Sequence, residues 1–74
     1  MRLEWRPKYG MEVLHLGEIE VGRVRKDGGR KGRPTWMFNL DAHIAFWHDE
    51  ATLDQAKAAV LMKMQNWLER AGLA

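Results

Sequence analysis

The stretch TLDQAKAAVLMKMQNWLERAG, residues 52–72, decides the fold because it carries the start, the periodicity and the end of one helix. Thr52 and Gln55 have the spacing of a capping box, in which each side chain bonds the other's free backbone N–H. Gly72 stands where a left-handed residue ends a helix. Apolar residues recur between them at steps of three and four: Leu53, Ala56, Val60, Met64, Trp67 and Ala71, with Leu61 and Leu68 widening the face.

The charges around this helix fit its macrodipole. Asp49, Glu50 and Asp54 place negative charge near the first turn, and Arg70 places positive charge near the last. The opposite face is expected to meet solvent, and its residues are Gln55, Ala58, Ala59, Met62, Gln65, Asn66 and Glu69. Because this face is not strongly basic, the pattern favours a helix that packs on a core over one that binds a membrane surface.

The first half of the chain has the alternation of strands. Residues 2–9 alternate charged and apolar side chains, and Pro7 either ends this strand or marks a sheet edge. Residues 11–16 are also strand-like, and Gly17 after them is either a hairpin turn or a bulge. In residues 18–21, Ile19 and Val21 share one face, and Gly22 can shift the register so that Val24 rejoins it.

Residues 35–40 are the clearest strand, and its alternate residues Trp36, Phe38 and Leu40 should face the helix. Between the two strand regions, Asp27-Gly28-Gly29 signals a tight turn. We expect it to extend into a mobile, irregular loop of about eight residues because residues 30–34 are too polar and too glycine-rich for a strand.

Residues 41–51 are the least defined part. Within them, residues 43–47 are open between a short fourth strand and a connection, and the lack of a turn before them favours the connection. The element order is β-β-β-α, and the expected fold is α+β: a three-stranded antiparallel sheet, with or without that short fourth strand, packed on one C-terminal amphipathic helix. A chain of 74 residues makes one domain, residues 1–74.

The amino-acid composition excludes several classes of function. The chain has no cysteine and no serine, which removes the two commonest covalent nucleophiles and any disulfide framework. Its N-terminus lacks the apolar run of a secretory signal, and no stretch approaches the length of a membrane span. We therefore expect a cytoplasmic protein that is not an enzyme and that needs no cofactor.

Positive charge is concentrated in one short segment. Residues 23–34 hold six basic residues against Asp27 alone, whereas the rest of the chain holds six basic and nine acidic residues. We define the basic segment by its cations: Arg23, Arg25, Lys26, Arg30, Lys31 and Arg33. Guanidinium and ammonium groups on a two-stranded ribbon can clamp phosphates, so this segment predicts contact with DNA or RNA. The alternative is a solvated turn whose charges serve solubility.

Two smaller motifs bear on this prediction. Lys31-Gly32-Arg33-Pro34 resembles the core of an AT-hook, which implies an extended segment in a narrow minor groove. Trp36, Trp5 and Trp47 could stack on bases, although aromatic residues in a small sheet are more often core.

Two other chemistries are weaker. The three histidines His15, His43 and His48 lack the spacing of zinc ligands, so no metal site is expected. Glu18 and Glu20 would share a strand face, where a solvated pair that meets Arg or Lys is favoured over acid–base catalysis.

At the level of the whole chain, the order of motifs resembles small phage- and prophage-type proteins with three strands and a C-terminal helix. The features are Gly22 before the basic turn, Trp36-Met37-Phe38 after it, Ala56-Lys57 early in the helix, and Trp67-Leu68 near the closing Ala71-Gly72-Leu73.

The outline is also similar to the N-terminal domains of phage-type integrases, which bind DNA through the sheet. That resemblance implies DNA contact by the sheet face away from the helix, in agreement with Arg23 and Arg25 on one strand face. Glu18 and Glu20 on the same sheet would repel phosphates, which favours the tip of the basic hairpin as the contact.

A second hypothesis needs no nucleic acid. In it, the chain is a protein–protein interaction module, either a homodimer or a phage-encoded modulator of a host protein. An open sheet edge or an exposed patch around Phe46 and Trp47 would provide the contact.

Overall fold

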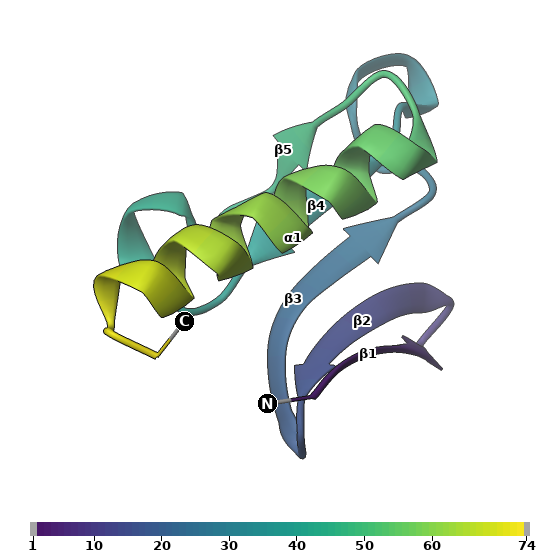
Figure 1. Ribbon diagram of the computed structural model, residues 1–74. Helices are drawn as coiled ribbons and strands as arrows, with labels where there is room; N and C mark the ends of the chain where they lie inside the picture. Colours follow the sequence, from purple (N-terminus) through teal and green to yellow (C-terminus); the bar gives the residue numbers. More distant parts are fainter. Residues whose placement is uncertain (1, 74) are drawn as a thin grey trace.

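Five antiparallel strands form one sheet in chain order, and the C-terminal helix lies across one face of it (Figure 1). The computed structural model describes residues 2–73. The α+β class is confirmed. The elements are β1 (Leu3–Lys8), β2 (Met11–Leu16), β3 (Ile19–Arg25), β4 (Thr35–Phe38), β5 (His48–Asp49) and α1 (Leu53–Arg70). Residues 2–73 include no helix with the length and hydrophobicity needed to cross a bilayer.

The strand count differs from the expected three for two reasons. Gly17 is a hairpin turn with φ of 60°, not a bulge, so β2 and β3 are separate strands. β5 adds a short fifth strand at His48–Asp49, which pairs with Thr35 and Trp36 of β4. Residues 43–47 form no strand, as favoured, and a 3-10 turn spans Ala42–Ile44. β5 is a strand only because it pairs with β4. Two residues are too few to show the alternation of side chains by which a strand is predicted from sequence.

The helix begins and ends at the residues that the capping box and the terminal glycine of the sequence indicate. The backbone N–H of Gln55 donates to Thr52 Oγ1 at 3.1 Å. At the other end, Gly72 has φ of 74°, its N–H donates to Glu69 O at 3.1 Å, and the N–H of Leu73 donates to Leu68 O at 2.8 Å. These two bonds are the Schellman pattern, which satisfies carbonyls that the helix leaves free.

The buried stripe of α1 is narrower than expected. Its buried residues are Ala56, Val60, Met64 and Leu68. Leu61, assigned to this face, is 40% exposed because it lies at the margin of the stripe, and Ala71 is exposed at the helix end. Ala59, assigned to the solvent face, packs partly against the core.

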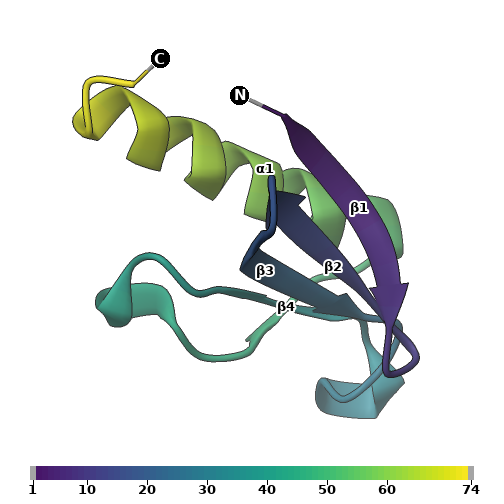
Figure 2. The same ribbon diagram turned by 90° about the horizontal axis from the view of Figure 1, so that it is seen from below.

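The core lies between α1 and the face of the sheet that we call the inner face. It joins the buried helix residues to Leu14, Val21, Val24, Trp36 and Phe38. The predicted placement of Trp36 and Phe38 against the helix is confirmed, and Leu40 packs partly against the same core. The view from below shows the helix and the sheet as two layers (Figure 2).

A bulge in β3 sets the faces of that strand. Leu14 pairs with Gly22, but the next residue of β2, His15, pairs with Glu20, so Val21 is an extra residue. The predicted register shift near Gly22 is confirmed, and Val21 and Val24 both reach the core. Ile19 was expected to share their face, but it is 60% exposed at the end of the hairpin.

Candidate nucleic-acid interface

The connection between β3 and β4, residues 26–34, is a folded turn. Arg30–Gly32 form a 3-10 turn in which Lys31 has a left-handed φ of 55°. The N–H of Gly29 donates to Arg33 O at 3.0 Å, which closes the base of this turn. Thr35 Oγ1 donates to Asp27 O at 3.0 Å. The predicted hairpin loop is present between the paired strands β3 and β4, and it has defined internal hydrogen bonds.

Asp49 on β5 anchors this turn. Its Oδ2 accepts the backbone N–H of Arg30 at 3.1 Å. A Cβ on Gly29 would lie 2.6 Å from Asp49 Oδ1 and 2.9 Å from Arg33 O, so the close approach requires glycine. The sequence assigned Asp49 to the helix start, but its carboxylate holds the basic turn, and Glu50 accepts the Trp36 Nε1–H at 3.1 Å. No local pattern predicts this because the contact depends on the β4–β5 pairing.

Arg23 lies on the outer face, by which we mean the face of the sheet away from α1. There its guanidinium is paired with the carboxylate of Glu20. Arg23 Nε donates to Glu20 Oε1 at 3.0 Å, and Nη2 donates to Oε2 at 2.9 Å. Residues three apart in a regular strand point to opposite faces, and the bulge at Val21 puts these two on the same face. Glu20 thus meets an arginine of its own strand, and its carboxylate balances the charge of Arg23.

The ion pair between Glu20 and Arg23 shifts the pKa of both side chains. The hydrogen bond from Arg23 lowers the pKa of Glu20, while desolvation opposes this in part. The same hydrogen bond raises the pKa of Arg23. Because the folded state favours ionised Glu20, the pair stabilises the fold above the unfolded pKa of glutamate. That contribution is lost as the pH falls below the ordinary pKa of glutamate and through the lowered pKa of Glu20.

This predicts a pH-dependent difference between the wild type and Glu20→Gln. At neutral pH the variant should lose up to about 1 kcal/mol of unfolding free energy, since the pair is partly exposed. The difference should shrink as the pH falls below about 4. Urea unfolding across this range measures it. Glu18→Gln is the matched control because Glu18 lies in the preceding turn and makes no ion pair within residues 2–73. A difference that is constant with pH would contradict the assignment.

Arg25 stays at the base of the basic turn. Its Nη2 lies 3.8 Å from Asp27 Oδ1, and its Cζ lies 5.4 Å from the centroid of the Trp47 ring. The sequence named Trp47 as a base-stacking candidate but not its contact with Arg25, which depends on how the connection after β4 folds back. Phe46 beside it is 55% exposed, with its ring centroid 4.2 Å from that of His48.

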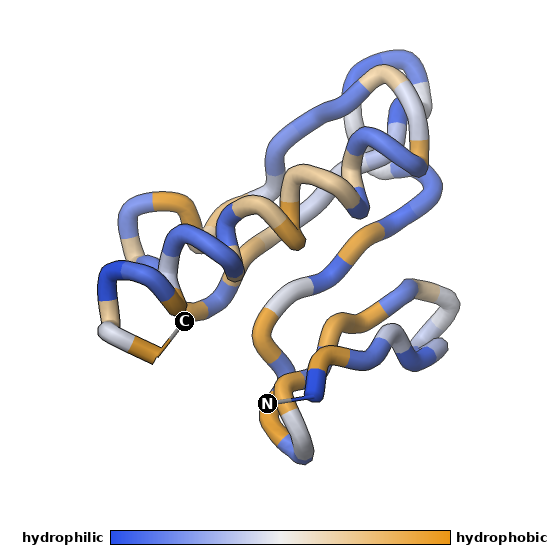
Figure 3. Tube along the Cα trace, viewed as in Figure 1, coloured by the Kyte–Doolittle hydropathy of each residue, from blue (hydrophilic) through white to orange (hydrophobic). Residues whose placement is uncertain are grey.

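The remaining cations of the basic segment are exposed: Lys26, Arg30, Lys31 and Arg33. None of them makes an ion pair within residues 2–73, whereas every other arginine in this range lies within 4 Å of a carboxylate oxygen. We call Arg30, Lys31 and Arg33 the cationic tip. The hydropathy trace shows the hydrophilic character of this loop (Figure 3). Tertiary structure therefore divides the six predicted residues into three groups: the cationic tip, the exposed Lys26, and the two arginines that pair with carboxylates, Arg23 and Arg25.

The AT-hook-like residues do not have an extended conformation. Lys31 and Gly32 have φ of 55° and 72°, both left-handed, whereas Arg33, with φ of −67° and ψ of 153°, is extended. The extended segment that the resemblance to an AT-hook implies is therefore absent at Lys31 and Gly32.

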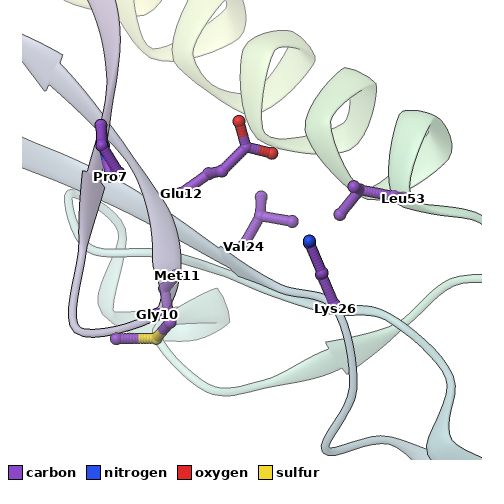
Figure 4. A pocket seen from close by; sticks show the side chains of 7 residues that line it. All are labelled: Pro7, Gly10, Met11, Glu12, Val24, Lys26 and Leu53. Carbon is purple, nitrogen blue, oxygen red and sulfur yellow. The ribbon is translucent and has the colours of Figure 1, made fainter.

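A groove of about 490 Å³ lies between the β1–β2 turn and the start of α1 (Figure 4). Its lining residues are Pro7, Gly10, Met11, Glu12, Val24, Lys26 and Leu53. Glu12 accepts a hydrogen bond from Lys57 Nζ at 3.1 Å, so its charge is balanced by the helix. Lys26 points into this groove (Figure 4), and none of the residues of the cationic tip lines it.

The histidines are dispersed. His15 is buried, with Nδ1 3.3 Å from Val13 O, and His48 stacks on Trp36 with ring centroids 4.3 Å apart. Residues 2–73 contain no group of three or more His, Asp or Glu that could hold a metal ion.

Comparisons with protein-family models, curated proteins and solved structures found no match. The resemblance to phage-type proteins and to integrase N-terminal domains therefore stays a prediction.

Proposed function

We propose that this chain is a small cytoplasmic nucleic-acid-binding domain, an accessory module and not an enzyme, that contacts the phosphate backbone through its cationic tip. One observation carries the proposal. Within residues 2–73, Arg30 and Arg33 are the arginines whose guanidinium groups have no carboxylate oxygen within 4 Å, and both flank Lys31 on one exposed turn. Guanidinium groups without a partner are the best phosphate donors that a surface can offer.

The support of the tip strengthens the proposal. Asp49 bonds the backbone N–H of Arg30, so the carboxylate fixes the main chain and leaves the guanidinium free. A turn already closed by hydrogen bonds loses less conformational entropy on binding than a flexible loop does. The aromatic residues near the base, Phe46 and Trp47, are suited to stacking on an unpaired base.

The expected recognition does not depend on base sequence. Three side chains on a short turn can reach phosphates, but they lack the rigid ribbon length that reading several base edges in the major groove requires. About three phosphate contacts should give a slope near −3 when log affinity is plotted against log salt for duplex DNA.

The proposal predicts that Arg30→Ala, Lys31→Ala and Arg33→Ala together lower affinity at least about tenfold at low salt and bring the salt slope close to zero. Fluorescence anisotropy with mixed-sequence duplex DNA, duplex RNA and single-stranded DNA measures both quantities. The three probes also decide which nucleic acid is preferred.

A charge-matched control distinguishes the tip from net charge. Arg2→Ala, Lys63→Ala and Arg70→Ala remove the same charge from the residue before β1 and from the second half of α1, and Figure 1 shows both of these segments away from the β3–β4 connection. This variant should keep most of the affinity. Undetectable binding by the wild type, or equal losses in the two triple variants, would overturn the proposal.

A further inference from the structure

β1 is an open edge of the sheet. The sheet order places it at one end, with β2 as its partner and no other strand beside it in residues 2–73 (Figure 2). Unpaired backbone groups along such an edge are a template for pairing with another strand.

The hydrogen bonds of the β1–β2 hairpin show which groups are free. Gly17 N–H donates to Arg2 O at 3.1 Å, so the backbone of Arg2 faces β2. Tyr9 and Gly10 form a two-residue turn, and their φ values of 54° and 73° are the two left-handed values of a type I′ hairpin. This turn type also indicates that the backbone groups of Arg2, and of every second residue after it, face β2. Because backbone groups alternate sides along a strand, those of Leu3, Trp5 and Pro7 face away from the sheet.

Pro7 limits what this edge can accept. It offers a carbonyl oxygen but no N–H, whereas Leu3 and Trp5 offer both. A partner strand therefore satisfies every free N–H of the edge only when Leu3 and Trp5 lie opposite free carbonyl groups.

The side chains of β1 divide by face. Leu3, Trp5 and Pro7 lie on the inner face, where Leu3 is 38% exposed and Trp5 is half-buried. Glu4 and Arg6 lie on the outer face, where Arg6 Nη2 donates to Glu4 Oε2 at 3.3 Å. The edge thus has an apolar strip on one face and a pair of opposite charges on the other.

We propose that β1 pairs with β1 of a second copy of this chain, antiparallel and centred on Trp5, so that two sheets join into one. In this register, each Trp5 N–H meets the C=O of Trp5 in the other copy. Each Leu3 N–H meets the C=O of Pro7, and the missing N–H of Pro7 leaves only the Leu3 carbonyl for water.

Charge and hydrogen bonding together select this register over its neighbours. Centring on Trp5 places Glu4 of each copy opposite Arg6 of the other, which is a favourable cross-strand pair. Moving the centre one residue toward the N-terminus places Glu4 opposite Glu4 and Arg2 opposite Arg6, and these pairs are all repulsive. Moving it one residue the other way keeps an attractive pair, Glu4 opposite Lys8. That register places Arg6 opposite Arg6, however, and it leaves the Leu3 N–H opposite Tyr9, which lies in the turn after β1.

The register also places Arg2 opposite Lys8 at both ends. These side chains are exposed, and solvent and salt screen exposed charges well. Glu4 and Arg6 are less exposed than Arg2, so the central attraction is screened less than the repulsion at the ends, and the association should be weak.

The test uses nuclease-treated full-length protein in sedimentation equilibrium up to about 1 mM, the range in which small interfaces associate. The wild type should form a dimer whose population rises with concentration. Glu4→Arg and Arg6→Glu should each weaken association about tenfold or more because each turns the attractive pairs into repulsive ones. Circular dichroism checks that both variants stay folded.

Two combinations of these charge reversals restore opposite charges at the paired positions 4 and 6. An equal mixture of Glu4→Arg and Arg6→Glu chains should form a heterodimer, and a chain with both reversals should dimerise again. A wild type that stays monomeric would overturn the proposal, as would single variants that associate as tightly as the wild type. A mixture that fails to associate would overturn the register.

Discussion

Phe38→Ala should leave a large share of the protein unfolded at 25 °C. Phe38 is 1% exposed and lies in the core between β4 and α1. Truncating a buried phenylalanine costs about 3–5 kcal/mol, from lost transfer free energy and the cavity that remains. A domain of 74 residues has a total stability of about 5 kcal/mol, so the loss consumes most of it.

Urea unfolding followed by far-UV circular dichroism measures this effect. Phe46→Ala is the matched control because it removes the same atoms from a side chain that is 55% exposed, and it should cost less than about 1 kcal/mol. Equal midpoints for the two variants would contradict the placement of the core.

The second large effect is expected at the contact between Gly22 and Val60. A Cβ on Gly22 would lie 2.6 Å from Val60 Cγ1 and 3.1 Å from Met37 O. Val60 is fully buried and its branched side chain has little rotamer freedom, so it cannot move aside. Gly22→Ala should therefore cost about 1–3 kcal/mol, the typical cost of an overpacked core.

A double-mutant cycle tests the cause of this cost. Val60→Ala alone should destabilise because it leaves a cavity, but in the Gly22→Ala background it removes the clash and makes room for the new methyl group. The double variant should therefore lose less free energy of unfolding than the sum of the single losses. Additive losses would mean that Gly22 is needed for the bulge backbone rather than for the close approach of α1.

The candidate site could be predicted only in part. The run of basic residues from 23 to 34 is visible in the sequence, and Arg30, Lys31 and Arg33 are exposed, as a phosphate contact requires. The ion pair between Glu20 and Arg23 follows from the one extra residue of the bulge, Val21, which brings two residues three apart onto the same face of the sheet. The anchoring of Arg30 by Asp49 joins residues nineteen apart and has no local signal.

Elements whose causes lie within a few residues could be predicted from the sequence. The helix from Leu53 to Arg70 follows from a cap, a periodicity and a terminal glycine, each of which acts within a few residues. The strand alternation around Trp36 and Phe38 acts over the same range.

The number of strands depends on tertiary contacts. The same is true of which cations lie without a carboxylate partner. β5 exists because β4 offers it a partner, and Arg23 and Arg30 differ because one lies beside a carboxylate and the other bonds one through its backbone alone. Strand pairing and ion pairing join distant residues, and their energies depend on distances that no window of sequence contains.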